Sequence, residues 1–210
     1  MNILHKPFRY TFKNATLGII IANAAVYFIT LLFPKLTAYL GLSVMGCMGM
    51  KFLWQPLTYM FVHSGWMHLI FNMIGLFCFG IMVEKAVGTK EFILMYFFCG
   101  IFDGIISMLI YYFTGQYRSL LIGASGAIYS ILLFYAVLFP RSILRIWGII
   151  PIPAPILIIV YAIIEFGSQF TGSRGNVAHL THLTGFALAW IYLVVRMGIH
   201  PVKVWKDAYR

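Results

Sequence analysis

The stretch LIGASGAIYSILLFYAVLF (residues 121–139) contains no charged residue. It is nearly as long as the roughly 20 apolar residues that cross the hydrocarbon core of a bilayer. Near its start, Ser125 stands between Gly123-Ala124 and Gly126. A serine in such a segment usually packs closely or hydrogen-bonds to its own helix. Whether Ser125 does chemistry depends on the polar residues that share its depth in the membrane.

The whole chain has the composition of a membrane protein. Of its 210 residues, 62% are hydrophobic and 10% are charged, whereas about 25% of the residues in a soluble domain are charged. Six segments are long enough to cross a bilayer, so we predict an all-α membrane protein folded as a six-transmembrane-helix bundle. The predicted spans are residues 17–33, 57–82, 92–113, 121–139, 146–166 and 177–195.

A single membrane domain of residues 17–197 is predicted, between cytoplasmic tails of residues 1–16 and 198–210. We expect no cleaved signal peptide, because the first apolar run lacks a convincing cleavage site. Cys47, Cys78 and Cys99 are predicted to be small packing residues, since they are odd in number and two fall within spans.

The basic residues predict the orientation of the chain. Its net charge is +10, and with the N-terminus inside, the inner segments hold eleven of the 15 Lys and Arg residues. Cytoplasmic segments are rich in Lys and Arg, so both termini are predicted to be cytoplasmic. Because these residues are scattered and form no stripe, we expect membrane lipid and no nucleic acid as a partner. The outer basic residues are Lys35, Lys51, Arg118 and Arg174.

Two connections between the spans have unusual compositions. Residues 34–56 form the longest outer loop, and they are apolar enough to lie partly in the membrane interface. Pro151, Pro153 and Pro155 crowd the inner end of the fifth span, where their missing N–H groups would loosen the helix. Either segment could therefore gate access to an interior site.

This topology places several polar side chains in one layer of the outer half of the bilayer. Ser125 lies four residues inside its span, or about 6 Å, and His182 lies five residues inside, or about 8 Å. The second span also starts outside and carries His63, His68 and Asn72. Polar residues at this depth are costly unless they face the protein interior or a water-filled cavity, so they indicate a functional site.

These residue types suit nucleophilic catalysis. A neutral imidazole such as that of His182 can take the proton of the Ser125 hydroxyl and make it a nucleophile. The oxyanion that forms would then be held by the Ser125 N–H, with His68 and Asn72 as side-chain donors.

Two carboxylic acids lie in or near the outer half of the spans. Asp103 is expected in the middle of the third span, and Glu165 near the outer end of the fifth. Neither is expected at the depth of the serine, so a Ser–His dyad is predicted and not a triad. No role for Asp103 follows from the sequence.

Three motifs resemble those of the rhomboid family of intramembrane serine proteases. They are GASG (residues 123–126), HSGWMHLIFN (residues 63–72) and AHLTHLTG (residues 178–185), and they fall on the fourth, second and sixth spans. The resemblance covers residues 17–197 and implies that Ser125 is the nucleophile. It also identifies the base as His182, because Gly185 follows it by three residues, whereas the residue at that spacing from His179 is another histidine.

The resemblance assigns supporting roles to further residues. Tyr129 matches a tyrosine that stacks on the catalytic histidine, and Glu84 lies in a glycine–glutamate–glycine element with Gly80 and Gly88. Two positions depart from the family pattern. Gln55 replaces an arginine after Trp54, which leaves the anchoring of the outer loop open, and Ala189 replaces a glycine. Gly123, Gly126, Gly185 and His63 complete the supporting residues of the predicted site.

The sequence thus predicts an intramembrane serine endopeptidase that cleaves single-span membrane proteins in or near their transmembrane segments through an acyl-enzyme. It predicts no cofactor and no metal in the reaction. The fold-level analogy favours a multi-pass protein of a bacterial inner membrane, with its active site toward the outer side.

Two other functions fit the same residues. A metal could be bound by His63, His68, His179 and His182, although no His-Glu-x-x-His motif is present. A rhomboid-like protein could also bind membrane proteins without cutting them, but such relatives lack the serine or the histidine. The natural substrate, the oligomeric state and the role of His179 do not follow from the sequence.

Overall fold

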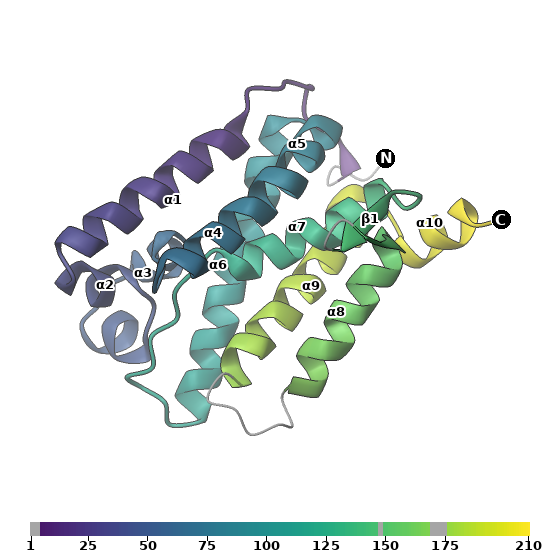
Figure 1. Ribbon diagram of the computed structural model, residues 1–210. Helices are drawn as coiled ribbons and strands as arrows, with labels where there is room; N and C mark the ends of the chain where they lie inside the picture. The colour runs from purple at the N-terminus through teal and green to yellow at the C-terminus, as the bar shows by residue number, and fades with distance from the viewer. Residues whose placement is uncertain (1–4, 147–148, 169–175) are drawn as a thin grey trace.

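Helices form most of the computed structural model, which describes residues 5–146, 149–168 and 176–210 (Figure 1). The first half contains α1 (Ala15–Leu32), α2 (Lys35–Leu40), the π-helical turn η2 (Met45–Gly49), α3 (Gln55–Thr58), the 3-10 turn η3 (Tyr59–Phe61), α4 (Trp66–Gly75), the π-helical turn η4 (Leu76–Gly80) and α5 (Ile81–Val87). The second half contains α6 (Thr89–Phe113), α7 (Ser125–Leu138), β1 (Ile143–Ile146), β2 (Ile150–Pro153), α8 (Ala154–Ser168), α9 (Asn176–Met197) and α10 (Pro201–Ala208).

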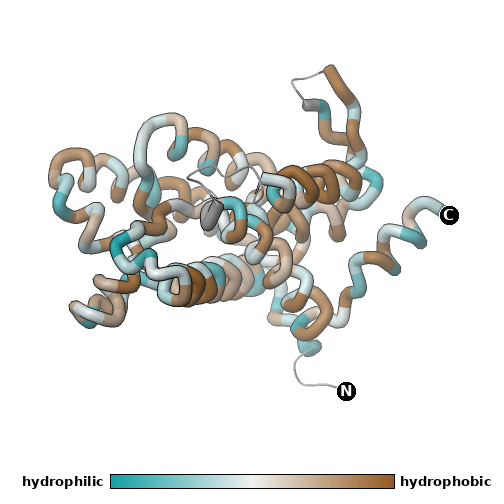
Figure 2. The backbone as a smooth tube through the Cα atoms, turned by 90° about the horizontal axis from the view of Figure 1, so that it is seen from below, coloured by the Kyte–Doolittle hydropathy of each residue, from teal (hydrophilic) through white to brown (hydrophobic). Residues whose placement is uncertain are grey.

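Four helical segments of the described chain are long and apolar enough to cross a membrane. They are Ala15–Leu32, Trp66–Val87, Thr89–Phe113 and His179–Met197, and two shorter apolar helices are Ser125–Leu138 and Ala154–Ser168. In Figure 2, hydrophobic residues are spread along the helical coils of the backbone, with more polar residues between them. The prediction of a helical membrane protein is confirmed, whereas the number of crossings stays a prediction.

The predicted second span, residues 57–82, begins too early. A separate short segment, α3 and η3, precedes it, and the long helix starts only at Trp66. Tyr59 and Met60 made the segment look like part of a span, but they are buried inside the protein. Their side chains fill the space beside Gly100 and Gly104 of α6, where added Cβ atoms would overlap them. The apolar character of this segment therefore reflects core packing.

The predicted fifth span, residues 146–166, also begins too early. An antiparallel hairpin of β1 and β2 comes first, with Ile143 opposite Pro153 and Ile146 opposite Ile150. Pro151 and Pro153 lie in β2, and α8 begins directly after them at Ala154. A proline ring favours extended backbone in the residue before it, so the prolines delay the helix. Arg174, in the following connection, lies outside the described residues.

Helix α7 lies in the centre of the bundle (Figure 1). Ten of its 14 residues are buried, and it packs against α6, α8 and α9. By contrast, α1 buries one stripe at helical spacing, formed by Thr16, Ile19, Asn23, Tyr27 and Thr30, and leaves its other faces outward. Such outward apolar faces suit contact with lipid. The serine helix is therefore the most enclosed part of this arrangement.

The predicted outer loop, residues 34–56, is anchored by Gln55, the residue that departs from the family pattern. Its side chain is fully buried. The amide nitrogen donates to the carbonyls of Ala38 and Tyr39 at 3.1 and 3.2 Å, and the amide oxygen accepts from the Ser43 N–H at 3.2 Å. Gln55 thus ties α3 to α2 and to the connection between α2 and η2, without a positive charge.

The opposite end of the bundle is held by Glu84, which is also fully buried. Its carboxylate accepts from the N–H groups of Ala15 and Thr16 at 2.8 and 2.9 Å, which start α1. It also accepts from the hydroxyls of Thr16 and Thr89 at 2.7 and 2.6 Å. At the start of α1, the carboxylate accepts hydrogen bonds from N–H groups that have no partner within the helix. Its negative charge also interacts favourably with the positive end of the helix dipole.

Candidate active site

Ser125 is the first residue of α7, so the helix begins four residues later than the predicted span, and the depth of Ser125 in the membrane stays a prediction. The chain before it is extended: Leu121 pairs with Leu42, and the Gly123 N–H donates to the Tyr59 carbonyl at 2.9 Å. Gly123 has a φ of 113°, and a Cβ there would lie 2.6 Å from His68 Nε2. Glycine is therefore required both for the turn into α7 and for the close approach of His68.

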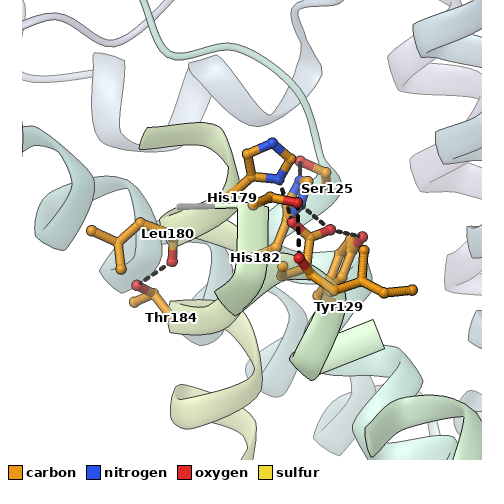
Figure 3. A network of polar contacts seen from close by, with 9 residues as sticks. Ser125, Tyr129, His179, Leu180, His182 and Thr184 are labelled. Carbon is orange, nitrogen blue, oxygen red and sulfur yellow. Dashed lines mark hydrogen bonds and ion pairs between the residues drawn. The ribbon is translucent and has the colours of Figure 1, made fainter. Parts of the chain in front are cut away.

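His182 of α9 reaches Ser125 across the bundle. Its Nε2 lies 3.1 Å from Ser125 Oγ, and its Nδ1 lies 2.9 Å from Oε1 of Glu165 on α8 (Figure 3). A carboxylate only accepts hydrogen bonds, so the proton of the neutral ring is assigned to Nδ1. The lone pair of Nε2 then faces the serine hydroxyl, as a general base requires.

The prediction that no carboxylate lies at the level of the dyad is wrong, because Glu165 contacts the imidazole of His182 directly. The error came from the helix bounds. Ser125 starts α7, and Glu165 lies one turn before the end of the antiparallel neighbour α8, so both are at the same end of the bundle. The sequence did carry a signal for this contact. A carboxylate in an apolar helix is costly and needs partners inside the protein.

The same carboxylate also binds His179 and Tyr129. His179 Nδ1 lies 2.6 Å from the second oxygen of Glu165, and the Tyr129 hydroxyl donates to the first (Figure 3). The Tyr129 ring stacks on His182, with centroids 4.1 Å apart and planes 5° from parallel. This stacking agrees with the expectation from the family resemblance, and it fixes the plane of the imidazole.

Close packing of α7 against its neighbours supports this geometry. A Cβ on Gly185 would lie 2.3 Å from the Gly126 carbonyl oxygen, and a Cβ on Gly126 would overlap the Asp103 carboxyl group. Glycine at both positions thus lets α9 and α6 approach the start of α7. Asp103 is fully buried beneath this turn. Its carboxyl packs there and does not contact the histidines in the interactions described for it.

His68 and Asn72 lie beside the serine from α4. The Ser64 N–H points at His68 Nδ1 at 3.4 Å, and the Ser64 hydroxyl lies 3.1 Å from the same atom. Because Nδ1 accepts from a backbone N–H, the ring proton is assigned to Nε2, the atom nearest Gly123. Asn72 is buried, and its Nδ2 donates to the His68 carbonyl at 2.7 Å. One of its two N–H bonds is thereby used within its own helix.

His63 supports His68 and does not contact the serine. It is buried, its Nδ1 lies 3.2 Å from the Phe61 carbonyl, and its ring meets that of His68 edge to face at 4.9 Å. The four-histidine metal centre is not the group that assembles. Within the described ranges, the metal-ligating atoms that converge belong to Glu165, His179 and His182.

A cavity of about 540 Å³ adjoins these side chains. Its polar lining consists of His68, Asn72, Ser125, Tyr129, Tyr161, Thr181 and His182. The remainder is lined by Gly75 and by apolar residues of α4, η4, α7, α8 and the chain before α7, among them Phe71 and Leu157. A segment in this cavity would thus meet the serine hydroxyl between two apolar helices.

Comparisons with known proteins agree with this arrangement. The family profile described as the rhomboid domain matches residues 50–198. RHOMBOID-like protein 12, mitochondrial, from Arabidopsis thaliana is 28% identical over an alignment of 194 residues that covers 85% of this chain and 57% of that protein. RHOMBOID-like protein 2 from the same plant is 32% identical over 145 residues, 67% of this chain and 43% of that protein.

A bacterial relative carries a functional name. Rhomboid protease GluP from Bacillus subtilis (strain 168) is 36% identical over 136 residues, which are 63% of this chain and 24% of that protein. The chain therefore spans between about a quarter and somewhat over half of the length of these three relatives.

Proposed function

Because this chain belongs to the rhomboid family, we propose that it is an intramembrane serine endopeptidase that cleaves single-span membrane proteins in or near their transmembrane segments. The observation that carries the proposal is the 3.1 Å contact between Ser125 Oγ and His182 Nε2 beside a cavity among apolar helices. The name of the bacterial relative, a rhomboid protease, supports it.

In the proposed reaction, His182 transfers protons through its ring nitrogen Nε2. Nε2 takes the proton of Ser125 Oγ as the oxygen attacks the substrate carbonyl, and the tetrahedral intermediate forms. The imidazolium then gives this proton to the leaving amine, which departs as the C–N bond breaks and the acyl-enzyme forms. A water molecule, activated by the same imidazole, attacks the ester and releases the acid and free Ser125.

The oxyanion of each tetrahedral intermediate is held at the start of α7. The first N–H groups of a helix have no partner within it, so the Ser125 N–H is suited to this role. His68 Nε2, assigned as an N–H, is the side-chain donor nearest Gly123. Asn72 contributes its second N–H bond. The three proposed donors thus reach the oxyanion from two helices, α4 and α7.

Glu165 turns the predicted dyad into a proposed Ser–His–Glu triad. Its Oε1 accepts from His182 Nδ1 at 2.9 Å, which holds the imidazole with Nε2 free to accept the serine proton. The carboxylate also stabilises the imidazolium that forms during attack. Tyr129 keeps the ring plane fixed by stacking.

The proposed setting is a six-span membrane domain with both termini in the cytoplasm. Support comes from the charge distribution and from the contact between the N-terminal segment and the end of α9, where the Lys6 carbonyl accepts from Arg196 at 3.1 Å. The boundaries 17–197 and the tails stay predictions. So does the bacterial inner membrane, because the relatives include a mitochondrial plant protein.

Substrates are proposed to reach Ser125 sideways, between α4 and α8. A stable helix conceals its peptide bonds in its own hydrogen bonds, so single-span proteins with small or helix-breaking residues near the outer face are the expected substrates. Ile74 and Leu157 line the cavity from the two helices. Cysteines at both positions, joined by a bis-maleimide in a Cys78→Ser background, should abolish cleavage, and unchanged cleavage would refute lateral access.

The proposed function is tested with purified protein and a panel of single-span substrates. Cleavage by the wild type should be lost in Ser125→Ala and in His182→Ala, and a fluorophosphonate should label the wild type but not Ser125→Ala. Cleavage that survives either substitution overturns the mechanism. Substrate binding without cleavage, equal in the wild type and Ser125→Ala, would instead indicate a non-catalytic binder.

A further inference from the structure

Three side chains near Ser125 bring metal-ligating atoms together, and the proposed reaction needs only part of this set. The atoms of Glu165, His179 and His182 lie within 4.8 Å of one another. The reaction uses one oxygen of Glu165 and both nitrogens of His182. The second carboxylate oxygen faces His179 Nδ1 at 2.6 Å, and His179 does not touch the serine in the contacts described for it.

The chemistry of this donor set matches zinc. Two imidazole nitrogens and one carboxylate oxygen are ligands that Zn²⁺ takes at about 2.0–2.2 Å, with a fourth position open to water. In a tetrahedral site with such bonds, neighbouring ligand atoms lie roughly 3.3 Å apart. The two histidines contact different oxygens of Glu165: His179 Nδ1 lies 2.6 Å from Oε2, and His182 Nδ1 lies 2.9 Å from Oε1. The ligand atoms of the three side chains lie within 4.8 Å of one another, so side-chain rotations would bring them to the spacing around one ion.

The spacing of the histidines along α9 favours the same geometry. His179 and His182 are three residues apart on one helix, so they lie on one face, and both direct Nδ1 toward Glu165 of α8. Tyr129 holds the site from α7, since its hydroxyl binds Glu165 and its ring stacks on His182. Contacts of this kind orient metal ligands.

The three side chains of the cluster differ in their exposure. The His179 side chain is 30% exposed, whereas those of His182 and Glu165 are 19% and 9% exposed. An ion could thus arrive past His179 and lose most of its water among the deeper ligands.

Occupation of this site would stop the proposed reaction. A neutral imidazole that binds a metal through Nδ1 carries its proton on Nε2. Nε2 of His182 would then be a donor toward Ser125 and could not take the serine proton. The ion would also remove Glu165 from its contact with the Nδ1–H.

We propose that Glu165, His179 and His182 form a Zn²⁺ site that inhibits the enzyme reversibly when it is filled. The ion is an inhibitor and takes no part in catalysis, in keeping with the absence of a metal from the proposed mechanism. The inhibition, although not the binding itself, rests on the proposed protease function.

The test combines direct binding with inhibition, on protein purified through a tag without histidine and freed of metal by a chelator. Zn²⁺ binding to Ser125→Ala is measured by competition with a fluorescent chelator, a readout that needs no activity. Visible absorption of added Co²⁺ reports whether the site is tetrahedral. We expect one ion per chain in Ser125→Ala, and at least tenfold weaker binding when His179→Ala is added.

The inhibition arm measures cleavage at rising concentrations of free Zn²⁺. The wild type should be inhibited, and excess chelator should restore its activity. His179→Ala should need at least tenfold more Zn²⁺ for half-inhibition. His200→Ala is the matched control, because His200 is an exposed histidine after the end of α9, and its zinc sensitivity should equal that of the wild type.

The possible outcomes separate the two proposals. Zinc binding that depends on His179 in a protein without protease activity upholds the site and refutes the proposed function. An active protease that binds no Zn²⁺ refutes the site alone. Equal zinc sensitivity of the wild type and His179→Ala also refutes the site, because the ion must then act elsewhere.

Discussion

The substitution Glu165→Gln tests whether the carboxylate takes part in the reaction. In the structure, its two oxygens accept from His182, His179 and Tyr129. A glutamine keeps the size of the side chain but replaces one acceptor oxygen with an NH2 donor and removes the charge. If the remaining oxygen faces His182, the ring keeps its orientation but loses a charged partner. If the NH2 group faces His182, the ring adopts the other tautomer and Nε2 cannot accept the serine proton.

The size of the effect can be bracketed from the contact of 2.9 Å between His182 Nδ1 and Glu165 Oε1. A charged hydrogen bond contributes about 1.5–3 kcal/mol and a neutral one about 0.5–1.5 kcal/mol. When the lost stabilisation of the imidazolium charge is added to the difference between them, the smallest expected loss of transition-state stabilisation is about 1.5 kcal/mol. Two unit charges 4 Å apart attract by roughly 4 kcal/mol at an effective dielectric constant of about 20, which sets the largest loss. Each 1.36 kcal/mol changes the rate tenfold. We therefore expect kcat to fall by about 10- to 1000-fold.

The assay measures kcat and KM separately in proteoliposomes with a fluorogenic single-span substrate. The fall should appear in kcat while KM stays within about twofold, since Glu165 stabilises charge that develops only in the transition state. Fluorophosphonate labelling of Ser125 should slow in parallel. Glu165→Asp, which keeps the charge but shortens the reach, should lie between the wild type and Glu165→Gln.

Glu91→Gln is the matched control for this substitution. Glu91 is also buried, but it binds Tyr192 and Arg196 at 2.7 and 2.8 Å, on residues that do not line the cavity. This variant should unfold at a lower temperature and keep its kcat. If Glu165→Gln retains a kcat within twofold of the wild type while Ser125→Ala is inactive, the dyad suffices and the triad is refuted.

Three further substitutions test the surroundings of the site. Gly185→Ala should lower both activity and the unfolding temperature, because its Cβ would lie 2.3 Å from the Gly126 carbonyl oxygen; wild-type values would mean that α9 can move away. His68→Ala should reduce kcat by about 100-fold with little change in KM if it holds the oxyanion, and a change confined to KM would contradict that role. Glu84→Ala should destabilise the fold by about 2–4 kcal/mol in denaturant titrations, because four hydrogen bonds to its carboxylate are lost, while the kcat of the folded fraction is unchanged. A similar stability with a reduced kcat would contradict a purely structural role for Glu84.

The apolar pattern predicted the helices of this chain well where burial and lipid exposure give the same signal. Residues 92–113 and 177–195 lie within α6 and α9, whose bounds differ by at most three residues. The pattern gave wrong span bounds where apolar residues pack in the protein core or form a hairpin instead of crossing the membrane. Tyr59 and Met60 pack into the core from short helical turns, and the isoleucines around Pro151 form a hairpin. Hydrophobicity alone does not distinguish these segments from a membrane span, because apolar residues are favoured both in a protein core and in contact with lipid.

The sequence identified the residues around Ser125 by their types and spacing, and the structure brings His182, His68 and Tyr129 beside it. The contact of Glu165 with His182 was not predicted, because the depth of each residue in the membrane depends on where its helix ends, and the apolar pattern does not define these ends. An error of four residues is about 6 Å along a helix, more than the length of any contact in the site. Contacts between helices depend on such offsets and on helix rotation, and neither is encoded in the spacing within one helix.

The carboxylate of Glu165 links the chemistry of the site to the packing of the bundle. Burying an ionised carboxylate among apolar helices is costly unless hydrogen bonds compensate for the lost water. Its partners come from α7 and α9, and these two helices come close together because Gly185 has no Cβ, which would lie 2.3 Å from the Gly126 carbonyl oxygen. If α8 moves outward to admit a substrate, Glu165 moves with it and leaves His182 without its acceptor. The proposed triad would then be complete only when α8 has returned, so the proposed cleavage would require a substrate with small side chains at the scissile bond.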